Sequence, residues 1–154
     1  MSSAREDDTD FGILLHLAFA RFKDALHAQL EREGFDDLGS SFGFVFRALD
    51  GAPLKLRDLA ERLGITPQGA LKIIDEMVAK KYVQRFADPA DGRATLLSLA
   101  PRGEKAIAAA KRFHRRFEAE LARRLGARRV ADARTVLTAL ADGSDAPAAG
   151  ARPF

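Results

Sequence analysis

The chain of 154 residues contains no cysteine and no tryptophan. Without cysteine it has no disulfide framework, no thiolate nucleophile, no cysteine redox sensor and no zinc site built from thiolates. Long hydrophobic runs are also missing. The best candidate for a membrane span, residues 11–20, includes a histidine and is only half as long as the roughly 20 residues that a span needs. The acidic segment before it, residues 5–8, argues against a signal peptide. We therefore expect a cytoplasmic protein.

The composition is that of a globular domain, with 47% hydrophobic and 31% charged residues. A chain of this length fits one domain with a single moderate core. The net charge of +3 and the sequence pI of about 9.5 are weak evidence for an acidic partner. The positions of the basic groups matter more than their excess.

Hydrophobic periodicity predicts a mainly α-helical fold. Apolar residues at the spacing i, i+3, i+4, i+7 predict a first helix over residues 10–33, ended by Gly34, and a shorter second helix capped by Ser40 or Ser41. Further helices are expected over residues 56–63 and 67–80, from Pro101, and after Gly126. Strands are expected over residues 82–87 and 93–99, around the turn D-P-A-D-G. Residues 1–9 and 142–154 have the composition of disordered ends.

A helix-turn-helix is predicted between residues 56 and 80. Gly64 suits the position just after a helix, Thr66 suits an N-cap, and Pro67 suits the first helical position, where its missing N–H costs nothing. Two short helices joined by so tight a turn form a helix-turn-helix. With the hairpin after it and helices on both sides, the order describes a winged helix-turn-helix flanked by long helices.

Two stretches carry a family resemblance: L-A-E-R-L-G-I-T-P-Q-G-A-L-K-I-I-D-E-M-V-A-K-K-Y-V-Q-R and D-P-A-D-G-R-A-T-L-L-S-L-A-P-R-G. They resemble the MarR family of bacterial transcription regulators. The resemblance implies a DNA-binding winged region over residues 51–100, with residues 10–50 and 101–141 forming a helical dimerisation region. It also implies a homodimeric repressor that binds a pseudo-palindromic operator in double-stranded DNA and is released by a small aromatic or anionic effector.

The hairpin tip is the first candidate contact with DNA. The resemblance implies that Arg93 enters the minor groove and that Asp91 holds it there. A narrow minor groove has an enhanced negative potential, and arginine is the side chain best suited to it. The alternative is that the two side chains only pair with each other at the end of a hairpin.

The helix over residues 67–80 is the second candidate contact. Its outward stripe consists of Gln68, Leu71, Lys72 and Asp75, opposite an apolar stripe. Gln68 can read adenine, Lys72 can reach guanine or phosphate, and Leu71 can touch a thymine methyl. Thr66 and the helix N-terminus suit a phosphate, and Gly69 permits close approach. The alternative is an ordinary solvated face.

The sequence departs from the family at three positions. Lys81 stands where glycine is common at the end of the recognition helix, so a non-glycine residue is expected at positive φ. Ala100 replaces the usual threonine and removes an N-cap. Phe42 stands where glutamine is common, in the region where family members bind effectors.

Effector-binding candidates are His16, Phe19, Phe42 and Phe46. Plain core aromatics are the alternative for the phenylalanines. His16 and His27 would lie about 16 Å apart along one helix, too far to share a metal, so neither a metal nor a cofactor is expected. We find no nucleophile–base pair and no phosphate-binding loop, which argues against an enzyme. A DNA-binding regulator without a ligand, and a winged helix that contacts protein or RNA, remain alternatives.

Overall fold

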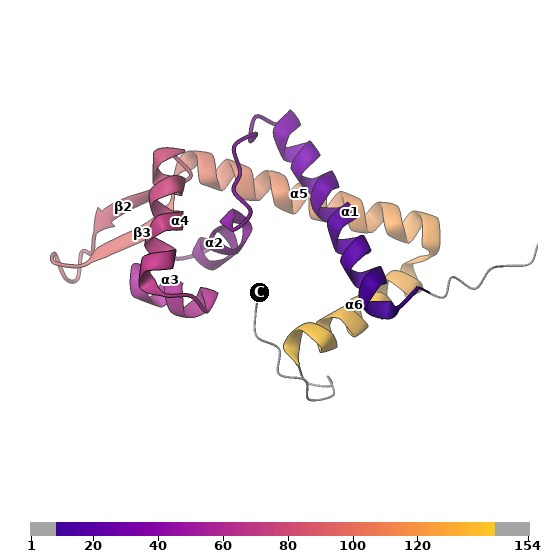
Figure 1. The fold of residues 1–154 in the computed structure, drawn as a ribbon. Helices are drawn as coiled ribbons and strands as arrows, with labels where there is room; N and C mark the ends of the chain where they lie inside the picture. The colour runs from indigo at the N-terminus through magenta and orange to yellow at the C-terminus, as the bar shows by residue number, and fades with distance from the viewer. Residues whose placement is uncertain (1–8, 144–154) are drawn as a thin grey trace, which may run out of the picture. The chain divides into compact units, whose positions relative to one another are not determined.

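The structure is a computed structural model that describes residues 9–143. The predicted tails, residues 1–9 and 142–154, lie outside this range except for their inner ends. The chain divides into two compact units, one up to Leu38 and one from Gly39 onward, and each is described by itself. The elements, in order, are α1 (Phe11–Arg32), α2 (Phe42–Leu49), β1 (Leu54–Lys55), α3 (Leu56–Leu63), α4 (Pro67–Ala79), β2 (Val83–Ala87), β3 (Thr95–Leu99), α5 (Pro101–Leu125) and α6 (Ala127–Asp142) (Figure 1).

The first unit contains the helix α1, which confirms the element predicted over residues 10–33. It ends where expected, because Gly34 takes a φ of +92° and the N–H of Phe35 donates to the carbonyl of Leu30 at 2.9 Å. Such a left-handed residue followed by a backward hydrogen bond closes a helix C-terminus. Five large apolar side chains in the first three turns are exposed: Phe11, Ile13, Leu14, Leu17 and Phe19.

The helix-turn-helix of the second unit forms as the turn residues predict. Gly64 takes the left-handed conformation at φ +64°, which ends α3. Thr66 then caps α4, since its Oγ1 accepts the N–H of Gly69 at 3.1 Å, and Pro67 occupies the first turn. Three nearby residues, Gly64, Thr66 and Pro67, therefore define the turn between α3 and α4 through their own backbone and capping preferences.

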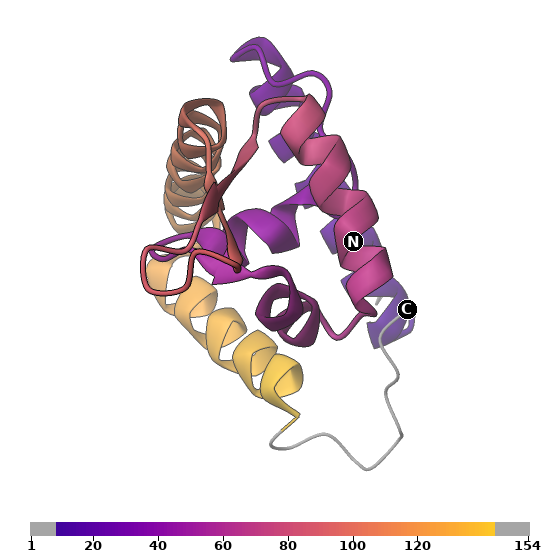
Figure 2. The same cartoon turned by 90° about the vertical axis from the view of Figure 1, so that its left-hand side faces the viewer.

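The sheet has three antiparallel strands in the order β1-β3-β2. Val83 pairs with Leu99 and Ala87 pairs with Thr95, so β2 and β3 form the predicted hairpin. β1 was not predicted, because two residues are too few to show an alternating pattern; it pairs Leu54 with Leu97. In Figure 2 the hairpin loop and α4 both lie toward the viewer, on one side of the unit.

The core of this unit contains a cluster of three aromatic rings. Phe42 and Phe46 of α2 both meet Tyr82 edge to face, with ring centroids 5.9 and 5.6 Å from the tyrosine. Tyr82 is fully buried, and Phe42 is only 2% exposed. We grouped residues 10–50 together from the sequence, but α2 packs in the same compact unit as the winged helix-turn-helix.

The C-terminus of α4 is joined tightly to the start of α5. Lys81 has a φ of +64°, as expected of a residue that stands in for glycine, and the N–H of Tyr82 donates to the carbonyl of Met77 at 2.8 Å. Arg102 donates to the carbonyl of Lys80 at 2.7 Å, and its guanidinium lies 4.4 Å from the centre of the Tyr82 ring. The start of α5 has no side-chain cap, as Ala100 predicts.

Replacing Lys81 by glycine should stabilise the protein by about 0.5–1 kcal/mol. A side chain at positive φ costs roughly 1–2 kcal/mol, and the greater freedom of glycine in the unfolded chain offsets only part of this gain. Ala79→Gly, at the last residue of α4, where φ is helical, is the control and should destabilise by up to about 1 kcal/mol. Urea unfolding measures both changes. A Lys81→Gly variant less stable than the parent would contradict the assignment of strain to this residue.

The helices α5 and α6 are connected by Gly126, whose φ is +98°. Arg134 of α6 forms an ion pair with Glu118 of α5, with its Nε 3.3 Å from Oε1. No residue of α6 is buried, and its apolar side chains Val136, Leu137 and Leu140 are exposed. Among residues 9–143, no helix combines the length and the apolar composition that crossing a membrane requires.

Candidate nucleic-acid interface

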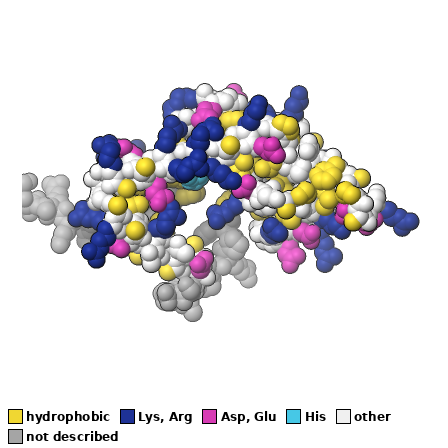
Figure 3. Space-filling model, turned by 180° about the vertical axis from the view of Figure 1, so that it is seen from behind, with side chains coloured by type: hydrophobic (Ala, Val, Ile, Leu, Met, Phe, Trp, Pro, Cys, Tyr) yellow, Lys and Arg dark blue, Asp and Glu magenta, His cyan; other side chains and the backbone are white. Residues whose placement is uncertain are grey.

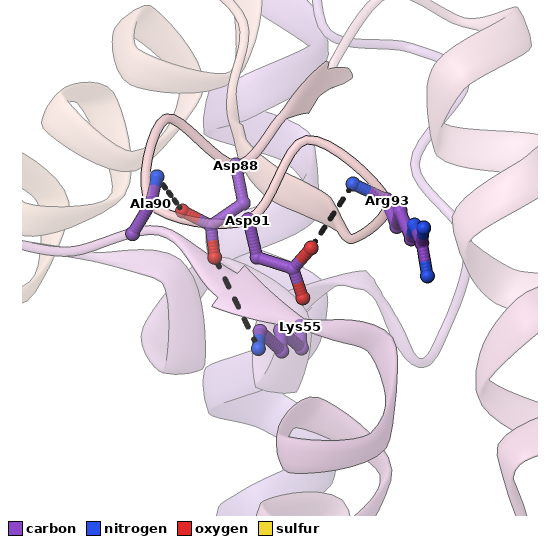
Figure 4. A network of polar contacts seen from close by, with 5 residues as sticks. All are labelled: Lys55, Asp88, Ala90, Asp91 and Arg93. Atoms are coloured by element: carbon purple, nitrogen blue, oxygen red, sulfur yellow. Dashed lines mark hydrogen bonds and ion pairs between the residues drawn. The ribbon is translucent and has the colours of Figure 1, made fainter.

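The loop between β2 and β3 is held by hydrogen bonds and an ion pair, part of which Figure 4 draws. The N–H of Asp88 donates to the carbonyl of Ala94, and the N–H of Ala94 donates to the carbonyl of Asp91, both at 2.9 Å. The carboxylate of Asp88 accepts the N–H of Ala90 at 2.9 Å and lies 3.9 Å from the ammonium of Lys55 in β1. Aspartates that bond to the backbone two residues on are typical of ordered turns. The hairpin tip is therefore a defined structure.

Asp91 and Arg93 are linked through the backbone. The Asp91 carboxylate accepts the backbone N–H of Arg93 at 3.1 Å, while the Arg93 side chain extends away from it (Figure 4). Arg93 is exposed, and its guanidinium has no hydrogen-bond or ion-pair partner among the described residues. The sequence left open whether the Asp91 and Arg93 side chains pair with each other; in the structure Asp91 binds the backbone of Arg93 instead. Asp91 orders the loop at Arg93 and leaves the guanidinium free to bind an anion.

The two stripes predicted for α4 lie on its buried and exposed sides. The apolar stripe was predicted as Ala70, Ile73, Ile74 and Met77; Ile73 is half-buried, and the other three are at most 1% exposed. The outward stripe of Gln68, Leu71, Lys72 and Asp75 is exposed along its whole length. An apolar side chain that remains 41% exposed, as Leu71 does, is available for an apolar contact such as a thymine methyl.

Thr66 and Gly69 lie at the N-terminus of α4 and depend on each other. The Thr66 hydroxyl oxygen accepts the Gly69 N–H, and a Cβ on residue 69 would lie 3.3 Å from that oxygen. Part of the reason for glycine here is therefore the cap itself. The hydroxyl proton of Thr66 remains available to an acceptor such as a phosphate oxygen.

One contact at this surface was missed from the sequence. Asp75, the last residue of the outward stripe, forms an ion pair with Arg85 of β2. The signal in the sequence was a carboxylate on a face expected to meet phosphates, because the two negative charges would repel each other. Ten positions separate the two residues, so only the packing of α4 against β2 brings them together.

The four effector candidates divide between the two units. His16 and Phe19 lie on α1, both exposed, with Phe19 at 63%. Phe42 and Phe46 are core residues of the second unit, because both pack on Tyr82. That packing matches the alternative of plain core aromatics. The surface hollow of about 530 Å³ between Leu49, Gln84, Glu104 and Lys111 does not include them.

The middle of α5 carries the basic residues Lys111, Arg112, Arg115 and Arg116 around His114. Figure 3 shows Lys and Arg side chains gathered beside a histidine near the middle of the rear face. Partial burial, and then the nearby cation of Arg47, lower the pKa of His114. Lys111 is paired with Asp50 at 2.6 Å. Within residues 9–143 no group of three or more His, Asp or Glu side chains is placed to hold a metal.

Comparisons with known proteins give one family-model match and a set of similar solved structures. Residues 44–94 match the model of the MarR family. No curated protein matches the chain significantly. Solved structures that resemble it include the YusO protein of Bacillus subtilis, with a TM-score of 0.65, 21% identity and coverage of 92% of this chain and 99% of that one. MarR of E. coli in its apo form has a TM-score of 0.57, 21% identity and coverage of 86% and 97%.

Some of the similar structures contain DNA. The transcriptional repressor CouR bound to a 23-mer DNA duplex has a TM-score of 0.67, 23% identity and coverage of 86% of this chain and 92% of that one. At this level of identity the likeness establishes the fold. The fold is that of a winged helix-turn-helix protein, and residues 44–94 within it match the MarR family model.

Proposed function

We propose that the chain is a homodimeric regulator that binds a pseudo-palindromic operator in double-stranded DNA and represses transcription in the cytoplasm. The observation that carries the proposal is the free guanidinium of Arg93 at the tip of an ordered hairpin. A charged side chain on an ordered loop, with no hydrogen-bond or ion-pair partner in the part of the chain that the structure describes, suits a narrow and negative minor groove. The exposed stripe of α4 supplies groups that read base edges in the major groove.

Homodimerisation is supported by apolar surface that a monomer leaves in water. Several large apolar side chains are exposed on α1 and on α6, the helices near the two ends of the described chain. Monomeric proteins rarely leave contiguous apolar patches of that kind exposed. Two copies related by a two-fold axis would present two recognition helices, with half-sites about 34–36 Å apart. Sedimentation that shows a monomer at micromolar concentration would remove the dimer and the palindrome together.

The test of DNA binding is a footprint on the region upstream of the protein's own gene, followed by affinity measurements over a range of salt. The logarithm of the binding constant should fall against the logarithm of salt concentration with a slope of about −0.9 per neutralised phosphate. A symmetric footprint is the expected result. Undetectable affinity for any duplex at ~50 mM salt would instead favour a winged helix that contacts protein or RNA.

Arg93→Ala should weaken DNA binding by about 1–3 kcal/mol without affecting the fold, because the side chain is exposed and its guanidinium has no hydrogen-bond or ion-pair partner within residues 9–143. Much of the loss should occur on operator and unrelated DNA alike, since the minor groove distinguishes base pairs poorly. Sites with a narrow minor groove should lose more. If affinity is unchanged on every duplex, the hairpin is an ordinary surface turn.

Gln68→Ala should weaken binding to the operator more than binding to random DNA, unlike Arg93→Ala. The loss should be about 1–3 kcal/mol on the operator and small on random DNA, because an amide that bonds bidentately reads one base. Both variants are compared on both duplexes at one salt concentration. Equal losses on the two duplexes would mean that Gln68 contacts the backbone instead of a base.

Release by a small aromatic or anionic effector is the finer part of the proposal. The exposed side chains of His16 and Phe19 support it, since both remain available to a ligand. A regulator without a ligand is the second candidate, favoured by the burial of Phe42 and Phe46 against Tyr82. Thermal shift against a panel of aromatic acids separates the two. A flat panel with intact DNA binding would support the regulator without a ligand.

A further inference from the structure

The ion pair between Asp75 and Arg85 lies on the surface proposed to meet DNA. Asp75 is the fourth residue of the outward stripe of α4, seven positions after Gln68 and so roughly 10 Å along the helix axis. Its side chain is 59% exposed, and the side chain of Arg85, on the neighbouring strand β2, is 36% exposed. The pair is therefore accessible to a phosphate backbone that passes along this face.

Stability is a poor explanation for an ion pair of this kind. Exposed pairs gain little Coulomb energy in water and lose side-chain entropy. α4 and β2 already pack against each other and are connected by the turn at Lys81, and Met77 of α4 and Val83 of β2 are both buried. The pair has its main electrostatic effect on a DNA phosphate that approaches it. Asp75 cancels the charge of Arg85, and its carboxylate repels the phosphate.

We propose that Asp75 neutralises Arg85 on the DNA-facing surface and so limits the affinity of the protein for DNA of unrelated sequence. The inference rests on the proposed DNA-binding function and names a specificity determinant within it. Phosphate contacts contribute to the affinity for every sequence, whereas base contacts distinguish the operator from the rest. A carboxylate that removes one phosphate-binding cation per subunit therefore lowers non-specific binding and leaves the readout by Gln68 intact.

The test is the affinity of purified variants for a random-sequence duplex of about two helical turns, by fluorescence anisotropy over a salt series. Asp75→Asn should bind about three- to tenfold more tightly near 0.1 M salt, with a slope steeper by about 0.9 for each subunit whose Arg85 gains a phosphate. Arg85→Gln, which leaves Asp75 unpaired, should bind more weakly by a similar factor. The double variant should return close to the parent affinity, because its net charge is that of the parent.

Asp132→Asn is the matched control. Asp132 is exposed on α6, has no ion pair in the part of the chain that the structure describes, and gives the same change of formal charge without releasing an arginine. Its affinity for the random duplex should change less than twofold, since an isolated exposed charge is largely screened beyond about 10 Å at this salt. Thermal melting of each variant confirms that it is folded.

Opposite signs for the two single variants separate this inference from a structural role. A pair that only fastens α4 to β2 would make Asp75→Asn and Arg85→Gln bind more weakly alike, with the double variant no better, and that result overturns the inference. So does an Asp75→Asn variant with parent affinity and slope. If the parent protein binds no duplex at all, the proposed function itself fails, and this inference fails with it.

Discussion

Leu137→Glu should convert the proposed homodimer to a monomer at micromolar concentration and abolish high-affinity operator binding. Leu137 is 51% exposed and lies between Val136 and Leu140, at 49% and 41%, on a helix with no buried residue. With Ala133 these residues follow the spacing i, i+3, i+4, i+7, which makes one continuous apolar stripe. We expect this α6 stripe to be covered by the second copy.

The size of the effect follows from burying an unpaired carboxylate. A charge left uncompensated in an interface costs about 3–5 kcal/mol, which weakens dimerisation on the order of 10²–10⁴-fold. A monomer reaches only one half-site, so operator affinity should fall at least as steeply at low protein concentration. Sedimentation velocity and DNA anisotropy on the same preparation measure the two losses.

Thr135→Glu is the control for charge and helix propensity. Thr135 is exposed on the same helix but on a different face, where its hydroxyl donates to the carbonyl of Ala131 at 3.1 Å. It receives the same carboxylate, so it should remain dimeric. A Leu137→Glu variant that sediments as a dimer would show that the α6 stripe is not part of the subunit interface.

Gly103→Ala should destabilise the winged domain by at least ~3 kcal/mol, the upper end of the cost of overpacking. A Cβ on residue 103 would lie 2.1 Å from the carbonyl oxygen of Tyr82 and 3.1 Å from its carbonyl carbon. That oxygen cannot move freely, because it accepts the N–H of Ala100 at 2.9 Å. The start of α5 would have to shift, and with it the contact of Arg102 with the end of α4.

Gly43→Ala provides the comparison. Gly43 is also helical and has nothing within 4 Å of the position that a Cβ would take. Alanine in that open helical position should stabilise by about 0.5–1 kcal/mol. Urea unfolding of both variants gives two shifts of opposite sign. If Gly103→Ala unfolds at the parent's urea concentration, the close approach of α5 to Tyr82 is not a real constraint.

Much of this fold was predictable because its signals are local. Gly64, Thr66 and Pro67 define the end of α3 and the start of α4 through their own backbone preferences, and the structure has those ends at the predicted residues. The strained φ of Lys81 and the uncapped start of α5 were predictable in the same way. In each case the relevant partner lies within a few residues along the chain.

Contacts between side chains of different elements could not be predicted from the sequence, because they depend on how the elements pack in the tertiary structure. The sequence contained Asp75 and Arg85, but it did not indicate that α4 packs against β2 in the register that pairs them. Phe42 and Phe46 were aromatic residues with two possible roles until Tyr82 was seen to contact both. β1 is a strand because it pairs with β3, where Leu54 lies opposite Leu97, 43 positions further along the chain (97 − 54).

The hairpin tip shows both sides of this division in one short stretch. The letters D-P-A-D-G-R were enough to predict a tight turn that presents an arginine, since aspartate, proline and glycine have strong local turn preferences. Whether Asp91 would bind the guanidinium of Arg93 or its backbone N–H depended on the path of the folded loop, and the structure has the backbone contact at 3.1 Å. Local backbone preference determined the turn, whereas the direction of a long, freely rotating side chain was decided only by the folded surroundings.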